Sequence, residues 1–424
     1  MSTRARTGVF VGKSTNAANA EKLIRERKRK DMLEKKKESW DDQLIFVLLA
    51  GMIYGVVAEK AKLTGHVRAQ FALTHWQYAK VTAAAAAAGL FVTGLLSIAG
   101  SFAGRRLETT SKDFALGGVR RPALVLGAAL CGVGMAVANA DPALAWAQAG
   151  SGHLGAWATI AGGVAGALLF GLLEPQLQES VCAVPPSAEL VKLKRLAGPA
   201  RPFLEVALPI SGVLALIAVG LETFYDWRVQ LGVVPLLGEG PQLPSSILVI
   251  PAQLYMHMKA WLPAYGGAAL GALQLLYVLV LYRTPGASRA YATLAAQATR
   301  LTERRGGDSG AASLAAALKA RPCFVEQRAL KIDNWLQVFF CLGLYGGGYV
   351  SSMMGEHDGQ YAAALNADPA ANFVGGMIML FGARLCGGGP VAHGISGVAL
   401  LNADSFLAIG LMLAAAVATT AAVY

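Results

Sequence analysis

The sequence predicts an all-α, polytopic membrane protein of about eight or nine transmembrane helices. Of the 424 residues, 55% are hydrophobic and only 15% are charged, and the mean hydropathy is +0.47. A soluble domain needs a larger polar share to cover its surface. Several stretches approach the roughly 20 apolar residues that a helix needs to cross a bilayer. Some are interrupted, which predicts short broken or re-entrant helices arranged in two pseudo-symmetric halves.

Nine segments of the chain are expected to be helical. In order they are Leu44–Val57, Val81–Gly100, Pro122–Ala138, Leu154–Leu173, Leu204–Leu221, Trp261–Tyr282, Trp335–Val350, Phe373–Leu385 and Phe406–Val423. The shorter ones are too short to span alone and are typical of half-helices, or of helices covered by other helices.

Charge predicts the orientation of the spans. The formal net charge is +11, and basic clusters precede the first span and follow the second, fourth and sixth. The remaining connections lean acidic. This alternation follows the positive-inside rule if the N-terminus and every second loop share the cytoplasmic or matrix-like side. It leaves the host membrane open between an organelle inner membrane and a plasma membrane.

Residues 1–40 form a basic N-terminal arm, and residues 41–424 form the membrane domain. The first half covers about 41–203 and the second about 204–424, with a basic loop at 283–331. The run "KLIRERKRKDMLEKKK" (Lys22–Lys37) orients the first span or, alternatively, docks to anionic lipids or to other membrane-complex subunits. Without interleaved aromatic residues, this arm is not expected to bind nucleic acid.

No catalytic, metal or cofactor site is expected. The five cysteines form no CxxC pair and have no His/Cys ligand spacing. The chain shows no phosphate-binding loop and no local signature of a Ser/His/Asp set. These absences argue against an enzyme.

Two interrupted apolar segments, one in each half, mark the candidate site. They are "ALCGVGMAVANADPALAWAQAGSGHLGAW" (Ala129–Trp157) and "MIMLFGARLCGGGPVAHGISGVALL" (Met377–Leu401). Each shows a helix, a break with proline, a stretch with glycine and histidine, and a second helix. Such paired interruptions point to a binding site near the membrane midplane. The predicted pathway residues are Asn139 and Asp141 on one side and Arg384, Gly387, Gly388, Gly389, His393 and Gly394 on the other.

Several of these residues also have purely structural interpretations. Glycines allow membrane helices to approach closely, although three glycines before Pro390 cannot continue a helix. Asp141 either caps the helix that begins near Pro142 or lines the pathway. His393 is either a hydrogen-bonded core histidine or a pathway contact. Arg384 is expected to meet a carbonyl cluster or Asp141.

The polar cluster at the end of the first span has two interpretations. Glu59, Lys60, Arg68 and Gln70 form either a solvated loop cluster or a vestibule to the pathway.

The stretch "GGMIMLFGARLCGGGPVAHGISG" resembles the signature of the YeeE/YedE family of sulphur-transport, thiosulfate-permease-like membrane proteins. The resemblance extends to "GMIYGVVAEKAKLTGHVRAQFAL" (Gly51–Leu73), to "QAGSGHLGAWATIAGGVAGALLFGLLEP" (Gln148–Pro175) and to "WLPAYGGAALGALQLLYVLVLYRTPGASRAYAT" (Trp261–Thr293). It therefore covers the chain from about Leu44 to the C-terminus.

The resemblance implies a mechanism in which pathway cysteines handle a sulphur-containing anion in relay, and this chain has lost those cysteines. The first family cysteine falls at Thr64 or Gly65, the second at Asp141 and the third at Gly389. Cys386, three positions before Gly389, is a candidate substitute. A carboxylate at Asp141 repels an anion unless it is protonated or paired with a cation.

Two functions are compatible with this pattern. The first is a permease that carries a small sulphur-containing or inorganic anion through a midplane pathway. The second is a transport-inactive member of the same family that serves as a structural subunit of a larger membrane complex. A continuous polar path between Asp141 and Gly389 favours the first, and an apolar plug favours the second.

Overall fold

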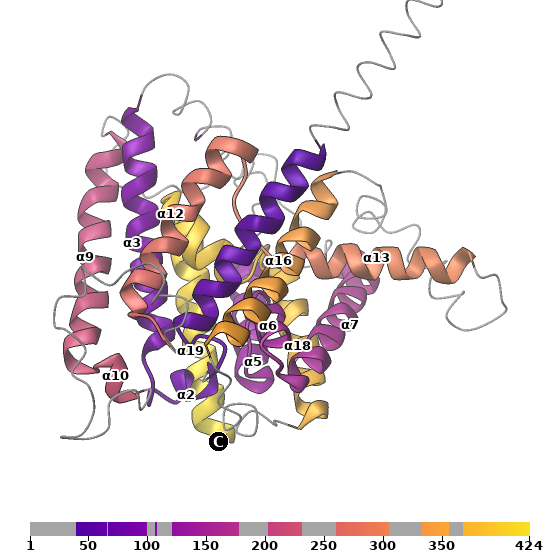
Figure 1. The fold of residues 1–424 in the computed structure, drawn as a ribbon. Helices are drawn as coiled ribbons and strands as arrows, with labels where there is room; N and C mark the ends of the chain where they lie inside the picture. Colours follow the sequence, from indigo (N-terminus) through magenta and orange to yellow (C-terminus); the bar gives the residue numbers. More distant parts are fainter. Residues whose placement is uncertain are drawn as a thin grey trace, which may run out of the picture. The chain divides into compact units, whose positions relative to one another are not determined.

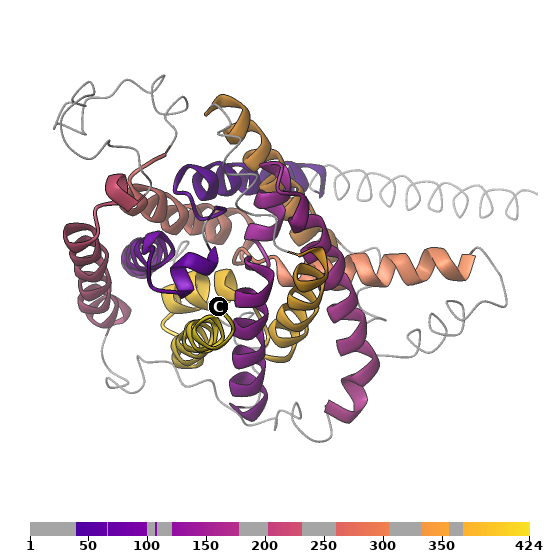
Figure 2. The same cartoon turned by 90° about the horizontal axis from the view of Figure 1, so that it is seen from below.

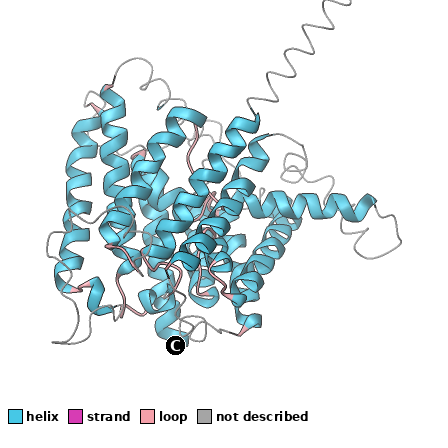
Figure 3. Ribbon diagram, viewed as in Figure 1, coloured by secondary structure: helices cyan, strands magenta, loops and turns pink. Residues whose placement is uncertain are grey.

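The computed structural model describes residues 40–65, 67–99, 107, 121–177, 202–230, 260–304, 332–355 and 368–424. Within these ranges the chain is helical and contains no β-strand, as Figure 3 shows. This confirms the all-α prediction. The basic arm before Trp40, and the part of the basic loop that follows Arg304, lie outside the described residues.

The chain divides into two compact units, Met1–Phe46 and Val47–Tyr424. Of the first unit, the structure describes only the opening turns of the helix Trp40–Lys60. The helix packing and the candidate site belong to the second unit. The division into two pseudo-symmetric halves remains a prediction.

All nine expected segments are helical, and Figure 1 shows their arrangement. They are the helix Trp40–Lys60, α3 (Gln77–Ile98), α5 (Arg121–Ala138), α7 (Leu154–Leu177), α9 (Phe203–Phe224), α12 (Pro263–Leu281), α16 (Ile332–Met354), α18 (Pro369–Leu385) and α19 (Ala403–Val423). Hydropathy located each helix but missed polar residues at the ends of several. In α3, for example, Gln77 and Lys80 are buried within the protein.

Seven of the helices in the described part of the chain are long and apolar enough to cross a membrane. The protein is therefore an integral, multi-pass membrane protein. The other two long helices are α16, with 23 residues, and α18, with 17. A 17-residue helix lies at the lower limit for crossing a bilayer.

Five further elements complete the described fold and were not predicted as helices. They are α2 (Val67–Phe71), α6 (Leu144–Gly150), α10 (Trp227–Gln230), α13 (Ser288–Arg304) and the π-helix η3 (Val391–Gly397). Of these, α6 and η3 each have seven residues and each lie between two long helices. The interrupted segments therefore have the expected pattern of a helix, a break and a second helix.

Glycines bring α5, α7 and α18 into close contact. A Cβ atom at Gly134 of α5 would overlap the backbone of Met379, and one at Gly162 of α7 would overlap the carbonyl of Phe373. Residues without a side chain let membrane helices approach until their backbones touch, which increases van der Waals contact. The closely packed helices α5, α7 and α18 hold both interrupted segments.

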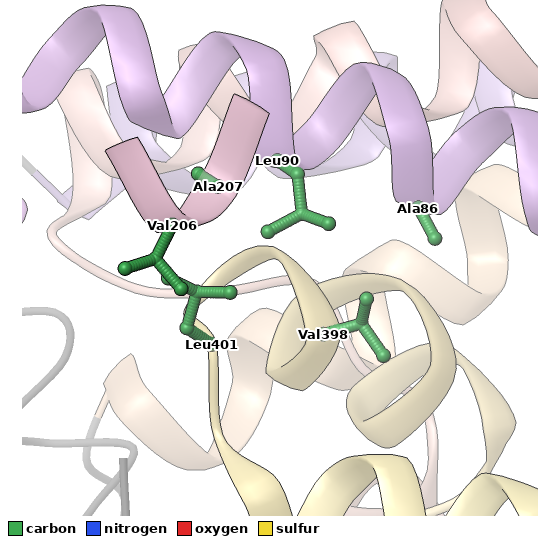
Figure 4. Packing of buried hydrophobic residues seen from close by; sticks show 6 residues of the cluster. All are labelled: Ala86, Leu90, Val206, Ala207, Val398 and Leu401. Atoms are coloured by element: carbon green, nitrogen blue, oxygen red, sulfur yellow. The ribbon is translucent and has the colours of Figure 1, made fainter. Parts of the chain in front are cut away.

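A small apolar cluster joins α3, α9 and the chain that follows η3. Figure 4 shows its six buried members, which are Ala86, Leu90, Val206, Ala207, Val398 and Leu401. Van der Waals packing of this kind is a main source of association between membrane helices. It anchors the second interrupted segment to α3 and α9.

An ion pair between Lys80 and Glu222 connects α9 to the start of α3. The Lys80 Nζ atom lies 2.9 Å from Glu222 Oε2, and the Lys80 side chain is 1% exposed. The same ammonium group donates a hydrogen bond to the carbonyl of Tyr225. A buried ammonium group needs such partners because its desolvation is costly. The pair explains how α3 begins with polar residues inside a membrane protein.

Replacing Gly162 with leucine is expected to destabilise the contact between α7 and α18 by about 1–3 kcal/mol, the usual cost of overpacking. The thermal unfolding midpoint of the detergent-purified protein measures the effect. Gly212→Leu is the matched control, because Gly212 lies on α9 and a Cβ atom there would have no neighbour within 4 Å. Equal midpoints for the two variants would contradict this view of the helix packing.

Candidate functional site

Asp141 lies in the break between α5 and α6 and is 3% exposed. Its Oδ1 atom accepts hydrogen bonds from the backbone N–H groups of Ala143 at 2.7 Å and Leu144 at 2.8 Å. Its Oδ2 atom accepts a third from the Tyr78 hydroxyl at 3.3 Å. The carboxyl group therefore caps the first turn of α6. This agrees with the capping interpretation, and the position is also the centre of the first interrupted segment.

Asn139 ends α5 in a left-handed conformation, with φ 53°. Asparagine tolerates this conformation better than most residues, which makes it a common residue after a helix end. Its side-chain Oδ1 accepts from the Arg68 backbone N–H at 2.7 Å. The backbone carbonyl of Asn139 accepts from Gln148 Nε2 at 2.9 Å. Asn139 thus connects the break to α2 and to α6.

Gln148 connects Thr64 to the break after α5. Its Nε2 atom donates to the carbonyl of Thr64 at 2.9 Å as well as to that of Asn139. Gln148 is 4% exposed. Thr64 is one of the two positions where the resemblance puts the first pathway cysteine. The amide of one buried side chain therefore holds that position beside Asn139.

The break in the second interrupted segment begins where α18 ends at Leu385. Gly387 has φ 83°, a conformation that side chains strongly disfavour. Pro390 then leads into η3, where the backbone bonds widen to the π-helical pattern. Such π-helical turns are uncommon and often lie at functional sites. Gly387–Gly389 therefore form the break between the end of α18 and the helical turn that starts at Pro390.

The two interrupted segments meet at Gly389 and Pro142. A Cβ atom at Gly389 would lie 3.1 Å from Cγ and 3.6 Å from Cδ of the Pro142 ring. Any larger residue at 389 would push against this ring. Two of the positions predicted from the sequence, Asp141 and Gly389, thus lie at a direct contact between the breaks. The group at this contact is the apolar Pro142 ring.

His393 is buried, and both of its ring nitrogens have hydrogen-bond partners. Its Nε2 atom lies 3.1 Å from the carbonyl of Cys386, and its Nδ1 atom lies 3.1 Å from Ser405 Oγ. A carbonyl only accepts, so Nε2 carries the proton and Nδ1 accepts from the serine. This arrangement is that of a core histidine that fixes the second break. The neighbouring Gly388 leaves room for the ring, since its Cβ would lie 3.3 Å from Nε2.

Arg384 lies in α18, before the second break, and Gly394 lies in η3, after it. The Arg384 guanidinium lies 5.6 Å from the centroid of the Phe170 ring on α7, within the range of a cation–π contact. It belongs to the last turn of α18, where a positive charge is favoured by the helix dipole. A Cβ at Gly394 would lie 3.0 Å from Ile409 on α19. Gly394 therefore serves close packing.

A cavity of about 540 Å³ opens beside the first interrupted segment. Its lining comes from the connection around α2, from Asn139 and from the end of α19, namely Gly65, Arg68, Ala69, Phe71, Ala72, Leu73, Thr74, Asn139, Val417, Thr420, Ala421 and Tyr424. The size is ample for a small inorganic anion. Arg68 supplies the positive charge of this lining.

Arg68 is held in place from two sides. Its Nη2 atom donates to the carbonyl of Val137 at 3.0 Å, and its Nε atom donates to that of Ala136 at 3.3 Å. The guanidinium carbon lies 3.8 Å from the ring centroid of Tyr424. Two of its five N–H donors are thus used on the last carbonyls of α5. The guanidinium is fixed at the edge of the cavity.

The other predicted vestibule residues have structural partners and do not line this cavity. Glu59 accepts from Lys62 Nζ at 2.7 Å and from Ser351 Oγ at 2.9 Å. Lys60 donates to the carbonyl of Ser351 at 3.2 Å. Gln70 accepts from the Tyr78 backbone N–H through its Oε1 atom. These residues connect the end of the helix Trp40–Lys60 to α16, and α2 to α3.

Sequence reasoning missed three residues that touch the break after α5. They are Tyr78 of α3, Gln148 of α6 and Tyr291 of α13, whose hydroxyl donates to the carbonyl of Pro142 at 2.8 Å. All three are buried. Buried tyrosine and glutamine in an apolar bundle are a usable signal, because such polar groups need partners.

An apolar helical bundle with interrupted helices that meet inside it is typical of membrane transport proteins. A family model for sulphur transport matches residues 60–418. The chain therefore belongs to the sulphur-transport family, as the YeeE/YedE resemblance predicted. A comparison with curated proteins found no match.

Replacing Asp141 with alanine is expected to lower the free energy of unfolding by about 1–2 kcal/mol, because the first amides of α6 lose their cap. Asp141→Asn is the matched variant, since its side-chain oxygen can still accept from Ala143 and Leu144. Thermal unfolding of the purified proteins compares them. Equal losses for both variants would show that the charge of Asp141, rather than its capping bonds, stabilises the fold.

Proposed function

We propose that this protein is a permease that carries a small sulphur-containing or inorganic anion through the centre of the helical bundle. One observation carries the proposal: a cavity lined by Arg68 and Asn139 opens beside the break that holds Asp141. The apolar Pro142 ring against Gly389 favours the transport-inactive alternative unless the two interrupted segments separate. Irregular backbone is tolerated inside a membrane protein where it is buried or lines a cavity. Membership of the sulphur-transport family supports the same conclusion.

The anion would enter at the cavity, where Arg68 is the recognition group. A guanidinium is planar and carries five donors, and it matches the oxygens of an oxyanion. With Nε and one Nη2 donor used on α5, the remaining donors are available to an anion in the cavity. Asn139 lies in the same lining and leads to Asp141 within the break. Arg68 would therefore concentrate the anion in front of the constriction.

The constriction would be the contact between Pro142 and Gly389. An ion can pass only if the two interrupted segments separate, because the proline ring lies against the glycine. Asp141 and its three donors lie beside this contact. A carboxylate here disfavours a bare anion, so its charge and its capping bonds would set which permeant passes. At positions 141 and 389, where the family resemblance puts cysteines, this chain has an aspartate and a glycine.

Replacing Arg68 with glutamine is expected to reduce anion uptake at low substrate concentration by about tenfold or more, the effect of losing one charge-assisted hydrogen bond. Uptake of radiolabelled thiosulfate and sulfate into proteoliposomes measures it. Lys62→Gln is the matched control, because it removes a positive charge from the same connection but outside the cavity lining. Equal uptake by the two variants would argue against entry at Arg68.

Restoring thiols with the double substitution Asp141→Cys/Gly389→Cys is expected to shift the preference from sulfate towards thiosulfate. A thiol is a polarizable donor suited to a soft sulphur atom, and the change also removes the carboxylate charge. The ratio of thiosulfate to sulfate uptake is measured for both proteins in the same liposomes. Uptake by the double variant alone would instead favour a native protein that has given up transport and serves as a structural subunit.

A further inference from the structure

The end of the connection between α12 and α13, together with the first turn of α13 (residues 284–291), is mostly buried in the bundle. It follows Tyr282, whose φ of 57° ends α12 in a left-handed conformation. Pro285, Gly286, Ala287 and Ser288 are all buried. A loop that only joined two helices at the membrane surface would be exposed to solvent. This connection is instead part of the core.

Three contacts fix the connection and the start of α13 along the first turns of α16. The backbone N–H of Arg289 donates to Gln337 Oε1 at 2.9 Å. Thr293 Oγ1 donates to the carbonyl of Asn334 at 3.1 Å, and Cys341 Sγ lies 4.0 Å from the carbonyl of Ala287. Arg283, just before the connection, pairs with Asp333 at 2.9 Å. All the α16 partners belong to the helix end that follows the basic loop.

The same connection contacts both interrupted segments. The Tyr291 hydroxyl donates to the carbonyl of Pro142 at 2.8 Å. Ser396 Oγ of η3 lies 3.4 Å from the carbonyl of Pro285. Pro142 is the residue whose ring lies against Gly389. Residues 284–291 thus join the two segments whose separation the permease would require.

Tyr291 is fully buried and closely enclosed. A Cβ at Gly163 of α7 would lie 2.7 Å from its ring, and the Trp146 ring of α6 lies edge-on at 5.9 Å. Tyr291 belongs to the first turn of α13, and this helix runs sideways out of the bundle in Figures 1 and 2. A shift of this helix along its axis would pull the hydroxyl off the Pro142 carbonyl. The geometry couples a peripheral helix to the constriction.

We propose that residues 284–291 are the gate at the basic-loop end of the pathway, with Tyr291 as the positioning residue that holds the constriction shut. The inference rests on the proposed permease function. The described cavity is lined by Asn139 and Arg68 and by none of residues 284–291. The structure is then the state that is open towards this cavity and closed towards the basic loop.

Cys341 is a native reporter for the opening of this gate. It is 0% exposed and lies against Ala287 of the gate. In the full-length protein in liposomes, Tyr291→Phe is expected to raise the rate of Cys341 alkylation by N-ethylmaleimide about tenfold, the effect of removing one buried hydrogen bond. Peptide mass spectrometry measures the rate. Cys131 of α5, also 0% exposed, is the internal control and should keep its rate.

Tyr277→Phe is the matched control variant. It removes a hydroxyl from a buried ring that packs against Phe340 of α16, outside the gate. If Tyr291→Phe does not fold, Ser396→Ala removes the second contact and should raise the Cys341 rate in the same direction. An unchanged rate in a folded Tyr291→Phe or Ser396→Ala protein overturns the gate. Absent uptake by the unmodified protein would refute the permease, while the alkylation rates still decide whether the segment opens.

Discussion

Every polar backbone group freed by a helix break inside an apolar bundle must find a partner within the protein, because lipid offers none. The breaks after α5 and α18 meet this constraint with side chains from other parts of the fold. Asp141 takes the first amides of α6, Gln148 and Tyr291 take the carbonyls of Asn139 and Pro142, and His393 takes that of Cys386. Apart from Asp141 itself, the partners come from α6, α13 and η3. The need to satisfy two breaks thus determines how these short elements are placed.

Close packing is what allows the two breaks to be neighbours. Glycines on α5, α7 and α18 let these helices touch through their backbones. Gly389 continues this pattern into the break, where a Cβ would already lie 3.1 Å from Pro142. In the proposed permease, the missing side chain of Gly389 would serve both close packing and the constriction of the pathway.

The chemistry of the break differs from that implied by the family resemblance. In the proposed permease, a permeant that reaches the contact meets a capped carboxyl group, a tyrosine hydroxyl, backbone carbonyls and a proline ring, and the nearby Cys386 thiol is hydrogen-bonded to the Gly388 carbonyl. Oxygen groups interact through charge and hydrogen bonds, whereas thiols offer a polarizable sulphur. The positive charge is kept apart from the carboxyl group, on Arg68 at the edge of the cavity. Recognition and passage would accordingly rely on different residues.

The sequence by itself determined the class of the protein, the positions of the nine helices that it predicted and the family, because these depend on local hydropathy and on short motifs. It also identified Asp141 and Gly389 as the centres of the two interrupted segments, since proline and glycine runs disrupt a helix wherever they occur. Only the tertiary structure decided that Pro142 lies against Gly389, that Arg68 rather than Glu59, Lys60 or Gln70 lines the cavity, and that Tyr291 reaches the first break. These contacts join residues far apart in the chain, and their geometry follows from helix packing that no local pattern encodes.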